Sequence, residues 1–371
     1  MSSIFLDTPT DQVVLNMGPQ HPSTHGVLRL IVKLEGETII DLKPDIGFLH
    51  RGTEKLSENR QYIQIVPYTD RMDYVAAMSN NLGYVLAVEK LEQIQVPERA
   101  IYLRTILVEL QRIASHLLWL GTFGMDVGAT TVFLYCFRER ERILNLFEEY
   151  IGARLTYNAM RVGGLPRDLP PGWDVKTYAF LEYLPPRLDE IDQLLTGNRI
   201  FEVRTQGVGV LSQKDAVGFA ASGPLARGSG LAFDLRRDQP YLIYDQLDWQ
   251  VVTQDSADCW GRYIVRVGEM RQSVGLVKQC LDKLPAGDVL DKTRAKYRPP
   301  KGEAFSHIEA PRGDYGCYIV SDGGPNPVRC RFRTPSFVNL QLLPLMSIGN
   351  KIADLVAILG SIDITLGDCD R

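Results

Sequence analysis

The residues best suited to proton or metal chemistry are histidines, and the chain concentrates them near its N-terminal end. Of its five histidines, His21, His25 and His50 lie within the first fifty residues. His21 and His25 share the segment GPQHPSTHG, in which two prolines and two glycines disfavour a helix and favour a stiff loop. A rigid loop that presents two imidazoles suggests a functional site.

Two other interpretations of this loop remain open on composition alone. Its histidines could simply hydrogen-bond to nearby backbone groups, as polar loop residues commonly do. A metal site has less support, because no third ligand stands at a characteristic spacing. The chain has six cysteines, and none of them forms a CxxC pair. This argues against a zinc site, an iron–sulfur site or a dithiol in this chain.

The composition excludes several other classes of function. The 371 residues are 45% hydrophobic and 23% charged, as in an ordinary globular protein, and the net charge of -4 makes nucleic acid an unexpected partner. There is no GxGxxG dinucleotide motif, Walker loop, GxSxG elbow or HExxH motif. No uncharged run reaches the ~18 residues of a membrane span, and the N-terminus lacks the pattern of a signal peptide. We therefore expect a protein on the cytoplasmic side that does not cross the bilayer.

Alternation predicts a small antiparallel sheet at the N-terminus. In VLRLIVKL, residues 27–34, the apolar residues Leu28, Leu30, Val32 and Leu34 share one face. A short turn around Gly36 leads into TIIDL, and residues 12–15 can add another strand.

Helical periodicity dominates from about residue 71 to residue 152. The clearest helix opens at Pro97, and it has an apolar stripe of Leu103, Ile106, Leu110, Ile113, Leu117 and Leu120. A second stripe of Thr105, Glu109, Arg112 and His116 predicts a polar, exposed face. The next helix, roughly 127–151, is expected to end at Gly152, with RERER at 138–142 as a solvated face.

The fold class predicted is α+β, with the helices forming a central bundle. A long stripe over residues 263–284 adds another helix, and residues 286–304 are expected to form an exposed connection. Two strands around Gly323-Gly324 and a short helix at 350–360 follow. The predicted regions are an N-terminal sheet at 1–55, a helical bundle at 56–285 and a mixed C-terminal region at 286–371.

Several blocks, taken together and in this order, closely resemble the D-subunit family of bacterial NADH:quinone oxidoreductase, respiratory complex I. They are GPQHPSTHGVLR, LHRGTEKLSENR, RTILVELQRIASHLLWLG, DVGATTVFLYCFRERE, RVGGLP and VAILGSIDITLGDCDR. The resemblance covers about residues 12–371, and LHRGTEKLSENR is a highly specific signature of that family.

The family is related in turn to the large subunit of nickel–iron hydrogenases, whose metal is held by one early and one late pair of cysteines. The resemblance therefore implies the hydrogenase large-subunit fold without its metal site. Here RMDY at 71–74 has no cysteine, and Cys369 in GDCDR stands alone. A nickel–iron site without thiolates is chemically implausible, so the resemblance implies no metal and no flavin in this chain.

In the family the emptied cavity takes a quinone headgroup between a histidine and a tyrosine, which match His25 and Tyr74. An aspartate matching Asp126 pairs with that histidine, and His21 lines the cavity. These residue types suit the reaction, because reduction to a quinol adds one proton to each carbonyl oxygen, and both side chains can donate one. A nearby carboxylate favours the charged form of a histidine.

Without the resemblance, Tyr74 would be interpreted as a buried helix tyrosine with a satisfied hydroxyl, and Asp126 as a helix N-cap. The charged residues Arg51, Glu54 and Lys55 fit a subunit contact as well as they fit chemistry.

The resemblance implies a subunit that is active only within an ion-translocating complex, peripheral on the cytoplasmic side of the cell inner membrane. Its partners would be a neighbouring subunit that supplies an iron–sulfur cluster and a membrane subunit at the quinone entrance. The alternatives are the equivalent subunit of a ferredoxin- or deazaflavin-dependent complex, and a purely structural scaffold subunit.

Overall fold

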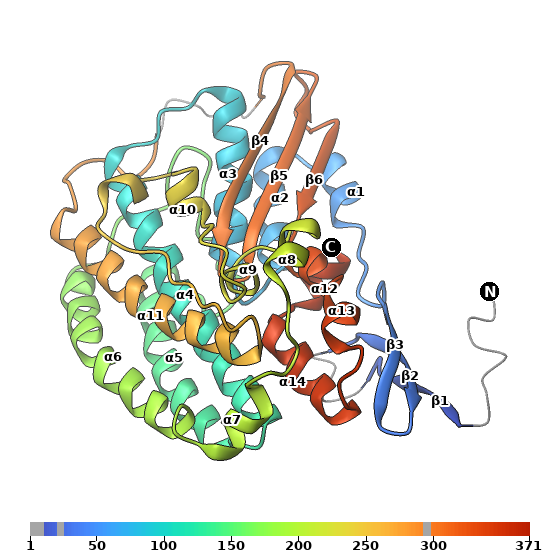
Figure 1. The fold of residues 1–371 in the computed structure, drawn as a ribbon. Helices are drawn as coiled ribbons and strands as arrows, with labels where there is room; N and C mark the ends of the chain where they lie inside the picture. The colour runs from blue at the N-terminus through green and yellow to red at the C-terminus, as the bar shows by residue number, and fades with distance from the viewer. Residues whose placement is uncertain (1–10, 21–25, 292–297) are drawn as a thin grey trace.

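The structure is a computed structural model that describes residues 11–20, 26–291 and 298–371. It is a mixed α/β fold with two small antiparallel sheets among many helices (Figure 1). The strands are β1 (Gln12–Met17), β2 (Arg29–Glu35), β3 (Thr38–Asp45), β4 (Gly302–Ala310), β5 (Gly313–Ser321) and β6 (Arg329–Arg333).

The long helices form the body of the molecule, and short ones connect them (Figure 1). The helices are α1 (Thr53–Glu58), α2 (Tyr62–Asp70), α3 (Ala77–Glu92), α4 (Glu98–Asp126), α5 (Thr130–Ile151), α6 (Trp173–Leu195), α7 (Arg199–Thr205), α8 (Gln213–Gly218), α9 (Pro224–Arg227), α10 (Leu235–Asp238), the 3-10 helix η2 (Tyr244–Gln246), α11 (Cys259–Asp282), α12 (Pro335–Leu340), α13 (Leu343–Ser347), α14 (Ile352–Ile362) and α15 (Leu366–Asp370).

The N-terminal sheet confirms the alternation seen in the sequence. Strands β1, β2 and β3 are paired in that order, and the turn at Gly36 has a positive φ of 59° that suits glycine. Leu28, Leu30 and Val32 are fully buried, so this sheet packs one apolar face against the rest of the protein.

The second sheet contains one strand that the sequence did not indicate. Strand β4 occupies residues that were in part expected to form an exposed connection, and it pairs with β5 through a two-residue turn of Pro311 and Arg312. Strand β6 then pairs with β5. The tip of the β4–β5 hairpin reaches the centre of the molecule beside α9 (Figure 1).

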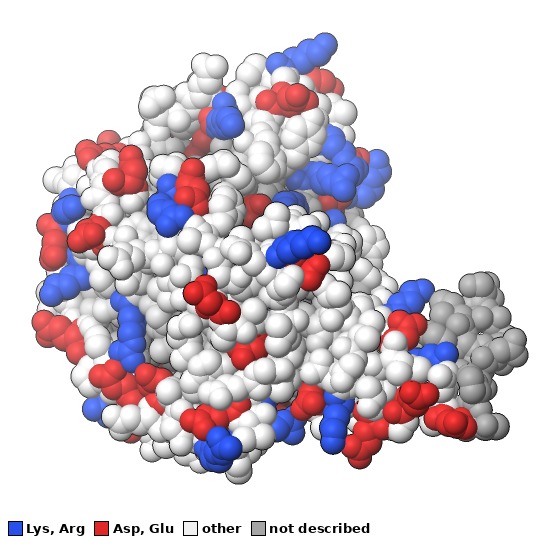
Figure 2. Space-filling view, viewed as in Figure 1, with Lys and Arg blue, Asp and Glu red and all other residues white. Residues whose placement is uncertain are grey.

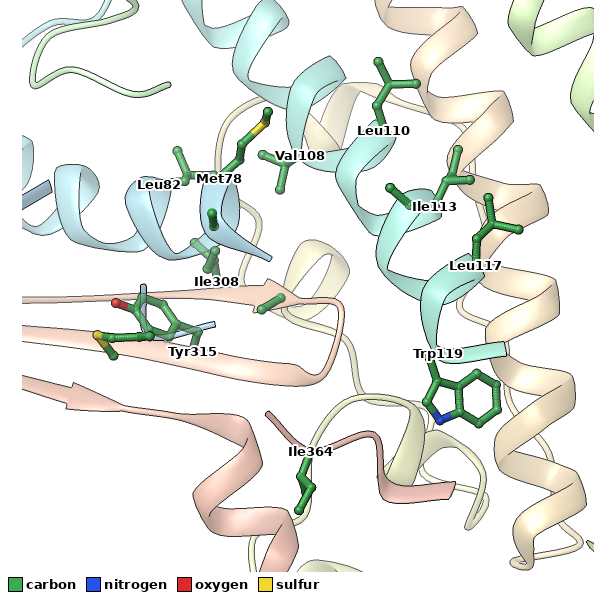
Figure 3. Close-up of a cluster of buried hydrophobic side chains, with 14 of the residues drawn as sticks. Met78, Leu82, Val108, Leu110, Ile113, Leu117, Trp119, Ile308, Tyr315 and Ile364 are labelled. Carbon is green, nitrogen blue, oxygen red and sulfur yellow. The ribbon is translucent and has the colours of Figure 1, made fainter. Parts of the chain in front are cut away.

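Helix α4 runs through the centre of the hydrophobic core, with α3, α5 and α11 packed around it. Figure 3 shows Met78 of α3, Ile113 of α4 and Ile308 of β4 converging on one apolar cluster. All residues of the predicted apolar stripe of α4 are buried. Pro97 is the N-cap of this helix, and the helix begins at Glu98.

The prediction of an exposed polar face on α4 is wrong. Thr105, Glu109, Arg112 and His116 are all fully buried. Their periodicity correctly shows that they share one side of the helix, but other elements cover that side and pair with its charges. Buried charges of this kind are tolerated only when they are paired and hydrogen-bonded.

Helix α5 ends at Ile151, and the C-cap Gly152 that follows it is left-handed, as expected. Its RERER run is largely solvated, with the exception of Glu139. That carboxylate is fully buried, and Arg138 Nε lies 2.5 Å from its Oε1. The prediction of a solvated face therefore holds for Arg138, Glu141 and Arg142, whereas Arg140 is half-buried and Glu139 is fully buried.

One face of the molecule carries few charges over α12 and α13, whereas charged side chains gather along the α6 and α11 side (Figure 2). Exposed apolar residues near α8 and α13 are Val217, Phe219, Leu345 and Ile348. In the described part of the chain, no helix is long and apolar enough to cross a membrane.

Candidate functional site

Tyr74 lies in the turn that joins α2 to α3, so it is not the buried helix tyrosine that its sequence context alone would suggest. Its side chain is 41% exposed, although the neighbouring Asp73 is 1% exposed. Burial raises the pKa of Tyr74, and the positive charge of Arg312 opposes that rise. The phenol is therefore neutral near pH 7, and it can donate a proton at the protein surface.

The turn is held by the carboxylate of Asp73. Its Oδ1 accepts hydrogen bonds from the backbone N of Val75 at 3.2 Å and from Thr365 Oγ1 at 3.3 Å. Its Oδ2 accepts a bond of 2.8 Å from Arg312 Nη1. One buried side chain thus fixes the backbone on which Tyr74 is carried.

The C-terminal segment packs directly against this turn. Helix α15 begins at Leu366, and a Cβ added to Gly367 would come within 2.6 Å of the carbonyl oxygen of Met72. Only glycine allows so close an approach of the two backbones. The RMDY and GDCDR segments, where the resemblance places the lost cysteine pairs, therefore lie side by side.

A second buried carboxyl group accompanies this contact. Asp368 is fully buried, and its Oδ2 accepts a hydrogen bond of 3.0 Å from the backbone N of Ser336. Its Oδ1 has no hydrogen-bond partner among the described residues. Burial, with the nearby charge of Asp73, raises the pKa of Asp368 to about 7, so this group holds a proton below neutral pH.

His21 and His25 lie outside the described residues. The chain resumes at Gly26, where an added Cβ would stand 3.1 Å from Leu366 Cδ1. Gly26 therefore lies against α15, the same short helix that contacts the turn of Tyr74.

Asp126 is the last residue of α4 and is half-buried. It is not the N-cap that its sequence context alone would suggest, because the next helix begins four residues later, at Thr130. Ser115, which contacts Arg312, lies 11 residues earlier on α4, or about 16 Å along the helix axis. Asp126, at the C-terminal end of α4, and Tyr74, in the turn between α2 and α3, are thus carried by different elements.

The charged residues after His50 mainly hold this chain together. His50 Nδ1 lies 2.6 Å from the carbonyl oxygen of Asp370. Glu54 accepts hydrogen bonds from the backbone N of Phe332 at 3.0 Å and from Arg371 at 3.3 Å. Arg51 donates to the carbonyl oxygen of Arg71 at 2.6 Å, which ties this segment to the turn of Tyr74.

Lys55 differs from these residues, because it forms a surface pair with Glu58 on the same helix. A cavity of about 360 Å³ lies between this segment and the C-terminus, and it is lined in part by His50, Glu54, Arg329 and Arg371.

A large cluster of buried charges, which the sequence did not reveal, lies against one side of helix α4. We call it the inner cluster, and it consists of Glu109, Arg112, His116, Arg227, Asp234, Arg236, Glu269 and Glu309. Helix α4 supplies three of these residues, and the others come from α9, α10 and its N-cap, α11 and β4. The periodicity of the polar stripe on α4 is the sequence signal for this cluster, but the stripe was expected to face water and it faces the protein interior.

Each acid of the inner cluster has an arginine partner. Arg227 lies 2.8 Å from Glu269 Oε1 and 2.8 Å from Glu309 Oε1, and Arg236 lies 3.2 Å from Glu109 Oε1. His116 Nε2 lies 2.9 Å from Glu269 Oε2. Burial lowers the pKa of His116 to about 4, so this imidazole is neutral near pH 7.

Among the described residues, no group of three or more histidine, cysteine, aspartate or glutamate side chains could hold a metal ion. Cys369 is buried, and burial raises the pKa of its thiol well above the ordinary value.

Comparisons with known proteins show the family to which the chain belongs. A family described as "Respiratory-chain NADH dehydrogenase, 49 Kd subunit" matches residues 126–299 and 291–371. The NADH-quinone oxidoreductase D-subunit of Geobacillus thermodenitrificans is 51% identical over 362 residues, covering 97% of this chain and 99% of the relative. A second relative, the NADH-quinone oxidoreductase D-subunit 2 of Solibacter usitatus, is 52% identical over 369 residues, covering 100% and 99%.

The chain belongs to the D-subunit family of NADH-quinone oxidoreductase. This confirms the family predicted from the sequence blocks. Membership makes the chain a subunit of complex I, an oxidoreductase whose activity belongs to the assembled complex.

Proposed function

We propose that this chain forms the quinone-reducing end of the complex, with His25 and Tyr74 binding the quinone headgroup and donating protons to it. Asp126 pairs with His25 and favours its charged form, and His21 lines the same cavity. The observation that carries the proposal is the environment of Tyr74. A partly exposed phenol stands on a turn that is fixed from behind by a buried carboxylate and a buried arginine.

The reaction is balanced by two electrons and two protons. Electrons arrive from an iron–sulfur cluster in a neighbouring subunit, after oxidation of NADH elsewhere in the complex. Each carbonyl oxygen of the quinone gains a proton, one from the imidazolium of His25 and one from the hydroxyl of Tyr74. Tyrosine is a weak acid in water, but it can still protonate the more basic oxygen of a reduced quinone.

The placement of Gly26 supports the proximity of the two donors. Gly26 lies against Leu366, and the neighbouring Gly367 lies against the backbone of Met72, two residues before Tyr74. The residue that follows His25 and the turn that carries Tyr74 therefore share a packing partner in α15.

A lipid-soluble quinone must enter from a membrane subunit, so we propose that this chain docks peripherally on the cytoplasmic side of the inner membrane. Its weakly charged face over α12 and α13 (Figure 2) is suited to contact with other subunits. Proton translocation would follow from quinone reduction in the assembled complex.

The substitution Tyr74→Phe tests this function, because it removes the donor and keeps the ring. In the assembled complex we expect quinone reduction to fall about 100-fold, which is typical when a general acid is lost. Electron transfer from NADH to an artificial acceptor such as ferricyanide should be unchanged, since it does not use this site. Normal quinone turnover would instead favour a purely structural scaffold. The polypeptides that copurify with the chain test which molecule donates the electrons. If they include ferredoxin-binding subunits, ferredoxin would take the place of NADH as the electron donor in the proposal.

A further inference from the structure

Arg312 connects several segments around the turn of Tyr74. It stands at the tip of the β4–β5 hairpin and is 2% exposed. Its Nη1 donates to Asp73 Oδ2 at 2.8 Å and to Ser115 Oγ at 3.3 Å. Its Nη2 donates to Asp363 Oδ1 at 2.9 Å, and its Nε donates to the carbonyl oxygen of Asp363 at 2.8 Å.

These contacts form a rigid clamp, because the planar guanidinium presents its donors in fixed directions. The clamp joins the hairpin to helix α4, to the segment before α15, and to Asp73. Asp73 in turn is bonded to Val75 and Thr365, so it holds the backbone just after Tyr74 as well as the C-terminal segment. A small displacement of Arg312 would therefore move the phenol.

The charge of Arg312 also acts on the phenol directly. Burial raises the pKa of Tyr74, as does the charge of Asp73, whereas the charges of Arg312 and Arg51 lower it. A tyrosine that gives up its proton becomes a tyrosinate, and a fixed buried cation stabilises that anion. Burial alone would lower the pKa of Arg312, but the nearby acids raise it, so its positive charge is permanent.

We propose that Arg312 is a positioning residue for quinone protonation, which holds Asp73 and so directs the Tyr74 hydroxyl at the headgroup. Its positive charge stabilises the tyrosinate left when the O–H bond of Tyr74 breaks and the O–H bond of the quinol forms. The two electrons of this step come from the cluster that the complex already reduces. This inference rests on the proposed function of Tyr74.

Arg104 provides a matched control for a purely structural arginine. It is also fully buried, and it forms a two-pronged ion pair with Glu89 at 3.0 Å and 2.6 Å. It also donates to the carbonyl oxygen of Arg161 at 2.7 Å. Arg104→Lys therefore removes a comparable set of guanidinium hydrogen bonds in the interior. These bonds join α4 to α3 and to the segment of Arg161, and they do not hold Asp73.

A double-mutant cycle in the assembled complex tests the inference. We expect Arg312→Lys to reduce the kcat of quinone reduction by about tenfold when Tyr74 is present, because a lysine keeps the charge but not the fork. When Tyr74→Phe is already present, Arg312→Lys should lower the kcat of quinone reduction by less than about twofold, because the effects of substitutions at residues that act as a unit are not additive. Arg104→Lys should change the kcat by less than about twofold relative to the complex with the same residue at position 74, in either background.

The outcomes separate this inference from the proposed function. If Arg312→Lys lowers the kcat by the same factor with Tyr74 present and with Tyr74→Phe, the proposed role of Arg312 is overturned and that of Tyr74 is left intact. Normal turnover of Tyr74→Phe would remove both. If Arg312→Lys prevents assembly, Asp73→Asn replaces it, because it weakens the clamp from the other side and keeps the arginine. If the effects of Asp73→Asn and Tyr74→Phe on the kcat of quinone reduction are then additive, the inference is overturned.

Discussion

Two buried groups of charges lie close to helix α4, and they differ in their access to the surface. The inner cluster is at most 2% exposed at every member, and each of its acids has an arginine partner. The clamp around Arg312 is also buried, but it adjoins Tyr74, which is 41% exposed. It also lies beside Asp368, a carboxyl group with one oxygen that has no hydrogen-bond partner among the described residues.

This difference separates a structural use of buried charge from a functional one. Charges that are sealed from water and ion-paired orient the segments that supply them, and changing their ionisation is costly. Protons can be exchanged only where a titratable group reaches the surface. The clamp therefore positions a group that can react, whereas the inner cluster joins α9, α10, α11 and β4 to α4.

The largest expected effect comes from breaking the inner cluster. Arg227→Met leaves Glu269 and Glu309 buried without their main cation, at a cost of about 3–5 kcal/mol in the free energy of unfolding. Denaturant unfolding of the full chain measures the loss, and the variant should fail to accumulate in the complex. A stable, assembled variant would contradict the structural role of this cluster.

A change at the edge of the proposed site should affect turnover and not folding. Asp126→Asn removes the charge that we propose supports His25, and we expect quinone reduction to fall about tenfold, as for other partners of functional histidines. Assembly is checked by blue native electrophoresis and should be unchanged. Unaltered turnover would exclude Asp126 from the site.

Asp368 beside the clamp and His116 of the inner cluster have pKa values shifted in opposite directions, so their contributions to stability depend on pH in opposite ways. The pKa of Asp368 is raised to about 7, so the folded chain binds more protons than the unfolded chain between about pH 4 and 7, and its stability falls across that range. The pKa of His116 is lowered to about 4, so its contribution to stability rises between about pH 4 and 6.5. Asp368→Asn should therefore raise the Tm of the full chain by about 2 °C at pH 8 and by less at pH 5. An equal shift at both pH values would contradict the buried, protonated carboxyl.

The smallest effect is expected at the surface. Arg271 lies 2.7 Å from Asp189, and both side chains are exposed, at 38% and 57%. Arg271→Ala should change the free energy of unfolding by less than about 1 kcal/mol, because water and salt screen such pairs. The same denaturant measurement provides the baseline for Arg227→Met, and a loss as large as that variant's would remove the contrast between surface and buried pairs.

Much of the fold followed from patterns along the chain, but strand β4 did not. The first sheet, the beginning of α4, the end of α5 and the apolar stripe of α4 were predicted because alternation and helical periodicity are local properties. Strand β4 has a weaker pattern, with Phe305 exposed and Glu309 buried. Glu309 is acceptable in the interior only because Arg227 reaches it from a distant segment.

For the candidate site too, some residues could be predicted from the sequence and others could not. Motif blocks identified the family and indicated Tyr74, Asp126 and the histidine loop, although the roles of these residues stay predictions. Nothing along the chain associates Arg312 with Asp73, because 239 positions separate them and their 2.8 Å contact depends on the hairpin reaching the centre of the fold.

By itself, therefore, the amino-acid sequence determined the family, the kinds of element and the direction that each side chain takes around its own helix or strand. Only the tertiary structure decided what each side chain faces. Periodicity shows that Glu109, Arg112 and His116 share one side of α4, but water and a layer of matching charges are equally compatible with that pattern. The choice between them was made by α9, α10, α11 and β4, which supply the opposite charges from segments more than a hundred residues further along the chain.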